Sequence, residues 1–137
     1  MDFANLIRWG AGVKIFWIIF AGSLKDTGYR YMIIFSEELR MIKSFKTKIA
    51  EDIFDGIESR NSRKLHSDLQ AKAVRLLDQI NAITDVETLR VPPSNHLEKL
   101  VGNYKDYWSI RINKQWRVIF RWVDGNAHDV DILDYHP

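Results

Sequence analysis

The sequence contains no cysteine and only three prolines in its 137 residues. The lack of cysteine excludes a disulfide framework, a cysteine nucleophile and thiolate metal sites, and it fits a reducing cytoplasm. The four histidines, at positions 66, 96, 128 and 136, lack the close spacing of metal ligands, so we predict no metal site and no cofactor. Internal repeats and low-complexity segments are also absent, and no apolar run is long enough to span a bilayer.

The composition is that of a soluble globular domain, with 46% hydrophobic and 28% charged residues. The net charge of +2 hides an uneven distribution. Residues 96–122 carry six basic and two acidic side chains, a local net charge of +4, whereas residues 124–134 carry four aspartates and neither lysine nor arginine. A local basic surface on a nearly neutral protein indicates a polyanion that binds at one place.

Residues 1–40 differ in pattern from the rest of the chain. They contain a dense apolar run, IFWIIFAG at 15–22, flanked by Lys14 and Lys25. This run is compatible with the core of a signal peptide, with a buried strand, or with sequence upstream of a true start at Met41. We favour the last interpretation, and we treat residues 1–40 as an N-terminal extension and 41–137 as the folded domain.

From Met41 onward the apolar pattern becomes regular. It predicts a short strand over Met41–Phe45, a helix capped by Thr47 that runs to about Ser59, and a second helix over 63–83. Both helices have apolar stripes at steps of three and four residues, which we assign to the core. Residues 84–95 should form an extended loop, because Pro92 and Pro93 disfavour helix.

Two alternating runs in Tyr107–Trp122 predict a β-hairpin around Asn113-Lys114-Gln115. A three-residue loop pairs Ile112 with Trp116, Ile110 with Val118 and Trp108 with Phe120, which places all six on one face. The same register sets Arg111 opposite Arg117, although like charges across a sheet cost stability. The arginines therefore indicate either an anion-binding surface or an ordinary solvated face.

A final strand is predicted over 128–135, after a three-residue turn at Asp124-Gly125-Asn126. This register pairs Val118 with Ile132, Phe120 with Val130 and Arg121 with Asp129, and it places Asp131 near the arginines and Tyr135 on their face. One alternative is that Arg117 merely pairs with Asp131. The helical hairpin must bury its apolar side, and the sheet is the available partner, so we predict an α+β domain.

The segments RVPPSNHLEKL, YWSIRINKQWRVIFRW and DGNAHDVDILDYHP resemble HigB-type toxins of the RelE/ParE superfamily, over residues 41–137. The resemblance implies a RelE-like fold and ribosome-dependent, metal-independent cleavage of mRNA in the decoding site. In this reaction the RNA 2′-hydroxyl attacks the adjacent phosphate. It also implies a helix-turn-helix, HigA-like antitoxin, the 70S ribosome and mRNA as partners, and a cytoplasmic location.

The resemblance also implies roles for particular residues. Arg117 is the first choice for stabilising the phosphate, and Tyr135 and His136 match positions that act in catalysis or hold the RNA. Asp134 completes the terminal Asp-Tyr-His, and His96 falls where relatives have histidine or arginine. The expected RNA-binding residues are Lys99, Lys105, Arg111 and Arg121. Two residues separate Lys99 from Gly102, whereas several relatives have lysine directly before glycine, so Lys99 and Lys105 both stay candidates for the basic group.

Two other functions are compatible with the sequence. The related ParE-type toxins share this fold but inhibit DNA gyrase without catalysis; the terminal Asp-Tyr-His and the clustered basic residues favour the nuclease. A plain RNA-binding module would need an exposed aromatic face. Most aromatic residues are predicted on the core face, which argues against this second alternative.

Overall fold

The computed structural model describes residues 4–9, 13–18 and 41–135. Contacts divide the chain into two units, Met1–Arg40 and Met41–Pro137. In the first unit, β1 (Ala4–Trp9) and β2 (Val13–Ile18) form an antiparallel hairpin. The first half of the apolar run lies in β2, and its second half lies outside the described residues. No described helix is both long and apolar enough to cross a membrane.

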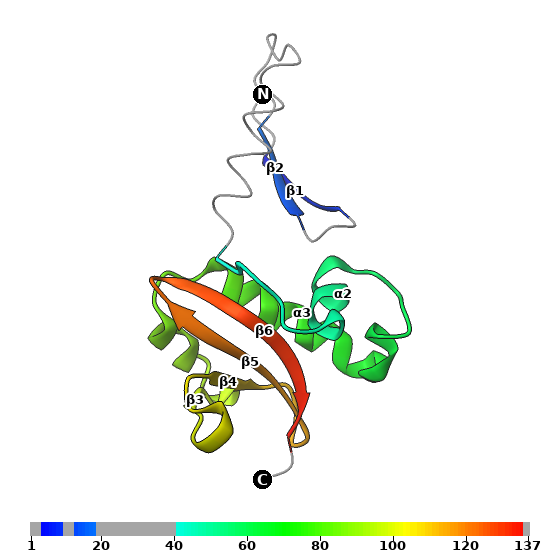
Figure 1. The fold of residues 1–137 in the computed structure, drawn as a ribbon. Helices are drawn as coiled ribbons and strands as arrows, with labels where there is room; N and C mark the ends of the chain where they lie inside the picture. Colours follow the sequence, from blue (N-terminus) through cyan, green and yellow to red (C-terminus); the bar gives the residue numbers. More distant parts are fainter. Residues whose placement is uncertain (1–3, 10–12, 19–40, 136–137) are drawn as a thin grey trace. The chain divides into compact units, whose positions relative to one another are not determined.

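The second unit has two helices and a four-stranded antiparallel sheet (Figure 1). The helices are α2 (Lys48–Asp55) and α3 (Ser67–Ala82). The strands, in their order across the sheet, are β3 (Glu98–Lys99), β4 (Trp108–Arg111), β5 (Trp116–Val123) and β6 (Asn126–Asp134). The predicted α+β architecture, a helical hairpin on an antiparallel sheet, is therefore confirmed.

One face of the sheet forms the core with the helices. The residues predicted to face the core are buried there: Ile110, Ile112, Val118, Phe120, Val130 and Ile132. Ala127 of β6 is buried with them. The helices add Ala50, Ile53, Phe54, Ala73, Leu76, Leu77 and Ile80. Trp108 and Trp116 pack against this cluster and stay partly exposed. The period-2 pattern of the hairpin thus determined which face of the sheet is covered.

The helix α2 begins where predicted and ends earlier. Thr47 occupies the N-cap position, but its hydroxyl donates to the Asp131 carboxylate instead of capping the helix. Gly56 takes a left-handed conformation, with φ of 72°, and its N–H bonds the carbonyl groups of Asp52 and Ile53. This glycine C-cap ends the helix at Asp55, so the prediction of a helix to about Ser59 was wrong.

The predicted second helix is two elements, so its N-terminal part was wrong. Ser62–Lys64 forms a 3₁₀ turn (η1), Leu65 is extended and fully buried, and α3 starts at Ser67. The ring nitrogen of His66 caps α3 by accepting the N–H of Asp68. Burial of Leu65 and this cap outweigh the continuous apolar stripe that suggested a single helix.

Two connecting segments also differ from the prediction. Residues 41–45 form no strand; Ile42 and Phe45 make isolated parallel bridges to Ala127 and Val130 on β6. Residues 84–95, predicted as an extended loop, contain the 3₁₀ turns η2 (Val86–Arg90) and η3 (Pro93–Asn95). Proline is compatible with the start of such a turn, because the missing N–H would have no partner there.

Val118 pairs with Ile132 as predicted, but the turn and the strand between them differ from the prediction. The turn has two residues, Asp124 and Gly125, both at positive φ as in a type I′ hairpin. A β-bulge at Asp129, with φ of 50°, then inserts one residue into β6. Arg121 therefore lies opposite His128, so the predicted pairing of Arg121 with Asp129 was wrong as a register position. Phe120, whose predicted partner was Val130, lies within the register shift.

A chain of residues 41–137 should fold without residues 1–40. The described core uses residues from Ile42 to Ile132. We expect the shortened chain to melt cooperatively, at a temperature within a few degrees of that of the full chain. Thermal unfolding followed by circular dichroism measures this. Loss of the cooperative transition would show that residues 1–40 contribute to the core.

Candidate functional site

The guanidinium of Arg117 is the centre of the candidate site. Arg117 lies on the central strand β5, directly opposite Arg111 on β4, as predicted. Its side chain is only 7% exposed, and its Nη1 donates to the Ser109 hydroxyl at 2.7 Å and to the Glu98 carboxylate at 3.1 Å. The ring of Tyr135 lies 5.0 Å from Cζ. These contacts orient the guanidinium. Arg117 is therefore not a freely solvated side chain, and its ion-pair partner is Glu98 rather than the predicted alternative Asp131.

The ion pair with Glu98 is asymmetric in its exposure. The Glu98 side chain is 50% exposed, whereas Ser109 is fully buried. Water therefore weakens the ion pair on the Glu98 side, while the bond to Ser109 is shielded. An incoming anion can displace Glu98 from Arg117 without disturbing the contact that holds the guanidinium from within the sheet.

Arg111 brings a second donor next to Arg117. Its side chain is half-buried, and its buried Nε has no hydrogen-bond partner among the described residues. A buried donor without a partner is costly, and so are two like charges placed opposite each other. An anion bound between the two arginines would relieve the repulsion of the paired charges, which favours the anion-binding interpretation over a solvated face.

The middle of the sheet face that carries Arg117 is covered and is not accessible to a ligand. Glu98, Ser109, Ile119 and Asp131 lie side by side across the four strands, and the last three are buried. Asp131 was predicted near the arginines, but its Oδ1 accepts from the Thr47 hydroxyl and the N–H of Ile132. The candidate site is therefore the end of the face with Arg111, Arg117 and Tyr135.

Alternation along the strands separates two predicted residues from this site. Lys99 pairs with Trp108, and its Nζ lies 5.0 Å from the centre of the Trp108 ring. Asp134 pairs with Trp116 and accepts from the side chain of Gln115 at 3.0 Å. Both tryptophans pack against the core cluster, so Lys99 and Asp134 lie on the face opposite to Arg117.

The other predicted residues have separate positions. His96 is exposed, has a φ of 45°, and ends η3 two residues before β3, beside β4. Lys105 is exposed at the end of η4 (Gly102–Tyr104). Arg121 pairs with Asp129 at 2.6 Å, and the hydrogen bond and charge of Asp129 raise the pKa of Arg121. His136 lies outside the described residues.

Tyr135 reaches the Arg117 face because it directly follows β6. Its N–H donates to the Gln115 carbonyl at 2.7 Å, which continues the pairing one residue beyond the strand. The side chain of Asn113 accepts the N–H groups of Gln115 and Trp116 at 2.9 and 2.7 Å and thus closes the β4–β5 loop. The closed β4–β5 loop and the backbone bond of Tyr135 hold the tyrosine ring next to the Arg117 guanidinium. Tyr135 therefore lies on the arginine face, as predicted.

Two residues of this site were missed by sequence reasoning in different ways. Ser109 was placed on the arginine face, but nothing in the pattern showed that it bonds Arg117. Glu98 belongs to a strand of two residues, which is too short to show alternation. Only its distance to Arg117 reveals its role. Among the described residues, no group of three or more His, Cys, Asp or Glu could hold a metal ion.

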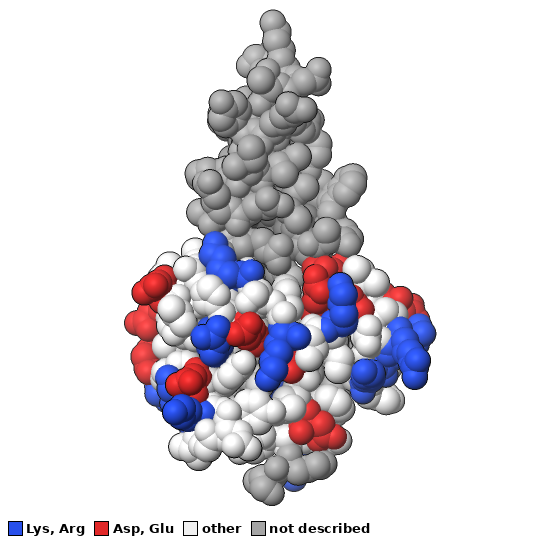
Figure 2. All heavy atoms as spheres, in the orientation of Figure 1, with Lys and Arg blue, Asp and Glu red and all other residues white. Residues whose placement is uncertain are grey.

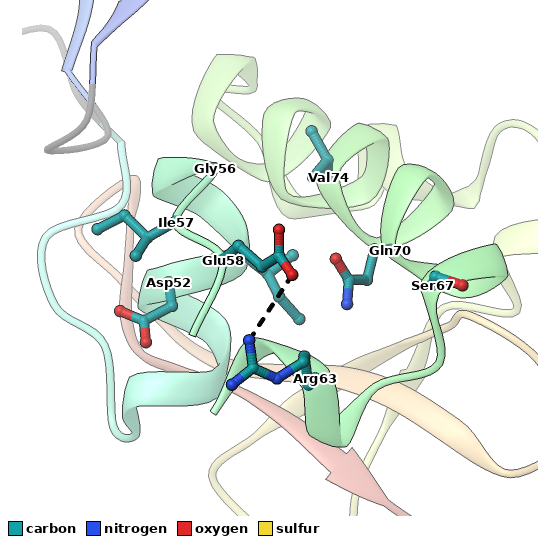
Figure 3. A pocket seen from close by; sticks show the side chains of 9 residues that line it. Asp52, Gly56, Ile57, Glu58, Arg63, Ser67, Gln70 and Val74 are labelled. Carbon is teal, nitrogen blue, oxygen red and sulfur yellow. Dashed lines mark ion pairs between the residues drawn. The ribbon is translucent and has the colours of Figure 1, made fainter. Parts of the chain in front are cut away.

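A cavity of about 410 Å³ lies elsewhere, between the C-terminal end of α2 and the start of α3 (Figure 3). The ion pair of Arg63 with Glu58, at 3.6 Å, crosses it. None of the residues discussed for the Arg117 site lines this cavity. Figure 2 shows basic and acidic side chains interspersed over the face in view, so the local excess of positive charge forms no continuous patch there.

Comparison with known proteins identifies the family of the chain. The family model of HigB-like toxins, described as RelE-like toxin of type II toxin-antitoxin system HigB, matches residues 43–136. Toxin HigB-1 of Vibrio cholerae is 39% identical over 96 residues, which are 70% of this chain and 98% of the relative. Endoribonuclease HigB of Proteus vulgaris is 30% identical over 101 residues, covering 70% of this chain and 100% of the relative. The chain therefore belongs to the HigB-like family of RelE-like toxins of type II toxin–antitoxin systems.

Proposed function

We propose that this protein is the toxin of a toxin–antitoxin pair and that it cleaves messenger RNA on the ribosome, in the decoding site. The observation that carries the proposal is the oriented, nearly buried guanidinium of Arg117, beside Tyr135 and on the strand position opposite Arg111. The name of one relative, Endoribonuclease HigB, supports RNA as the substrate class. The proposed partners are a HigA-like helix-turn-helix antitoxin, the 70S ribosome and mRNA, and the proposed location is the cytoplasm.

The proposed reaction is an internal transfer of the RNA phosphate. The 2′-hydroxyl attacks the neighbouring phosphorus, the bond from phosphorus to the 5′-oxygen breaks, and a cyclic phosphate and a 5′-hydroxyl remain. One proton leaves the 2′-oxygen and one reaches the 5′-oxygen, so the balance needs no other reactant. The side chains must supply a base, an acid and a cation for the charge that develops on the phosphate oxygens.

Arg117 is the proposed cation, and Glu98 is the group that the phosphate replaces. The guanidinium fork suits two phosphate oxygens at once, and Arg111 adds a donor from the neighbouring strand. Because Glu98 is half-exposed, it can turn toward solvent when the phosphate enters. The buried bond to Ser109 then keeps Arg117 oriented throughout the reaction, so little reorganisation accompanies the development of charge.

Tyr135 and His136 are the proposed proton-transfer groups. The centre of the Tyr135 ring lies 5.0 Å from the guanidinium carbon of Arg117, which supports a role for the tyrosine hydroxyl at a phosphate bound to Arg117. His136 follows it directly in the sequence, and His96 remains a further candidate from the segment before β3. Asp134 lies on the other face, so we propose that it acts indirectly, by holding Gln115. The side chain of Gln115 donates to Asp134, and its backbone carbonyl accepts the N–H of Tyr135.

Cleavage should depend strongly on the ribosome. The site offers few acids and bases, so positioning of the substrate must supply much of the rate, and a misplaced substrate costs on the order of a hundredfold. The experiment compares cleavage of a labelled mRNA with and without programmed ribosomes, and gyrase supercoiling is assayed with the same preparation. Equal rates on naked RNA would contradict ribosome dependence. Gyrase inhibition without RNA cleavage would replace the nuclease with the ParE-like alternative.

Activity should survive removal of metal ions from the protein. Attack by a 2′-hydroxyl can run on side chains alone, and the proposed mechanism assigns every role to a residue. The protein is treated with chelator and separated from it before it meets ribosomes that keep their own magnesium. We expect the untreated rate. Loss of activity that zinc or manganese specifically restores would contradict this prediction.

A further inference from the structure

A second group of aromatic and basic side chains lies near the start of β4. The rings of Tyr104 and Tyr107 meet edge to face, with centroids 5.7 Å apart. The Nζ of Lys46 lies 5.4 Å from the centre of each ring. The exposed Lys105 follows Tyr104 directly in the sequence. We refer to Lys46, Tyr104 and Tyr107 as the tyrosine cluster; it joins segments about sixty residues apart in sequence.

The tyrosine cluster lies on the same face of the sheet as Arg117. Alternation along β4 places Tyr107 on the side of Ser109 and Arg111. Tyr107 also interacts with Arg121 of β5, which is 40% exposed; it adds to the larger effect of Asp129 in raising the pKa of Arg121. Most aromatic residues of the sheet lie on the core face, as predicted: Phe120 is buried there and Trp108, Trp116 and Trp122 pack against the core. Tyr107 and Tyr135, predicted on the arginine face, lie on that face, and Tyr104 joins them through its contact with Tyr107.

The chemistry of the tyrosine cluster suits a nucleotide. Lys46 is exposed and has no ion pair among the described residues, so its charge is held against two aromatic rings and is not neutralised by a carboxylate. Both tyrosines are partly exposed. Aromatic rings that stack with bases, beside a cation for the phosphate, are the combination that binds single-stranded RNA without strong sequence preference.

The spacing along β5 fits an RNA strand that reaches both sites. Arg117 marks the cleavage site and Arg121 lies beside the tyrosine cluster, four residues further along the strand. At about 3.3 Å per residue, the two arginines are separated by roughly 13 Å. Stacked nucleotides are about 3.4 Å apart along one strand, so this distance covers more than one nucleotide. The buried row with Ser109 and Ile119 separates the two sites, which makes the tyrosine cluster a distinct subsite.

We propose that the tyrosine cluster is a second RNA subsite, which stacks a base a few nucleotides away from the cleaved bond while Lys46 contacts the adjoining phosphate. This inference rests on the proposed function, since it assumes RNA as the substrate. The subsite holds the strand in the direction that presents the scissile phosphate to Arg117. Its residues bind the substrate and take no part in the chemical step.

Binding of RNA by the full-length protein tests the subsite independently of cleavage. The probe is a short fluorescent single-stranded RNA with 2′-O-methyl groups, which the proposed reaction cannot cleave. We expect Tyr104→Ala to weaken binding about tenfold, because stacking on an aromatic side chain contributes on this scale. Tyr104→Phe keeps the ring and should bind like the parent. Lys46→Ala should weaken RNA binding and should also reduce the salt dependence of the affinity by about one phosphate contact. The control is Lys64→Ala, which removes an exposed lysine of η1 and should change neither the affinity nor its salt dependence.

Cleavage of RNAs with single abasic positions locates the stacked base. On programmed ribosomes, the parent protein should cleave more slowly when one position a few nucleotides from the cleavage site is abasic, and the rate of Tyr104→Ala should be insensitive to that same change. Unchanged binding and unchanged abasic sensitivity in folded Tyr104→Ala and Lys46→Ala variants would overturn the subsite. A parent protein that binds the probe through Tyr104 but never cleaves RNA would instead contradict the proposed function and leave the subsite intact. Weaker binding of the antitoxin with unchanged RNA binding would reassign the cluster to a protein partner.

Discussion

Replacement of Arg117 by alanine should slow RNA cleavage by on the order of a hundredfold or more, because it removes the cation at the charged transition state. The nearly buried guanidinium, oriented by Ser109 and bordered by Tyr135, has little freedom to reorganise. Arg111→Ala should cost less, since Arg111 borders the site from β4 and serves mainly to attract the phosphate backbone. The main effect of Arg111→Ala should be a weaker dependence of RNA binding on salt concentration. Single-turnover cleavage on programmed ribosomes measures both effects.

The Arg117 experiment needs a control for folding, because the residue is also a buried hydrogen-bond donor. Its removal leaves the fully buried Ser109 hydroxyl without this donor, at a cost of about 1–3 kcal/mol. Thermal melting of each variant shows how much of that cost is realised. Arg117→Lys keeps the charge and loses the fork, so it should recover only part of the rate. A folded Arg117→Ala variant with the parental rate would remove Arg117 from the mechanism.

Tyr135→Phe should lower the cleavage rate by about a hundredfold or more, the usual scale for loss of a proton-transfer group. Phenylalanine keeps the ring against the guanidinium, so the variant isolates the hydroxyl from the cation–π contact. Tyr135→Ala should lose the cation–π contact as well, so its cleavage rate should be lower than that of Tyr135→Phe. The measurement is again single-turnover cleavage, as a function of pH.

The comparison of the two Tyr135 variants distinguishes chemistry from packing. If Tyr135 serves only to hold Arg117, Tyr135→Phe will keep the parental rate and Tyr135→Ala alone will be slow. That result would transfer the proton-transfer role to His136 or His96. Deletion of His136 and Pro137 is the matching test at the chain end: it should slow the chemical step and leave the melting temperature unchanged, because chain ends contribute little to a core.

Local pattern was a reliable guide where one face of a strand is buried. The hairpin from Tyr107 to Trp122 has the predicted pairs, since a shift of one residue would expose its whole apolar face. The helix ends were predicted less well because they depend on caps, at Gly56 and His66, that compete with apolar periodicity. The β5–β6 register was right near Val118 and wrong near Arg121, because a shorter turn and a bulge compensate each other.

The sequence by itself determined the fold class, the covered face of the sheet and the pairing of Arg111 with Arg117, because each follows from alternation and from the need to bury apolar side chains. The sequence also placed Tyr135 on the arginine face, since the alternation of side chains between the two faces of β6 continues one residue beyond the strand. The candidate functional residues came from resemblance to known toxins, because physical pattern alone does not select them.

Only the tertiary structure decided which of these residues meet. Asp134 pairs with Trp116, the residue before Arg117, but it lies on the other face of the sheet, as Lys99 does. Glu98, from a strand of two residues, takes the place beside the guanidinium that an anion would occupy. The tyrosine cluster depends on Lys46, which bridges from the segment before α2 to Tyr104 and Tyr107. Such contacts join segments far apart in the chain, where no local period links one residue to the next.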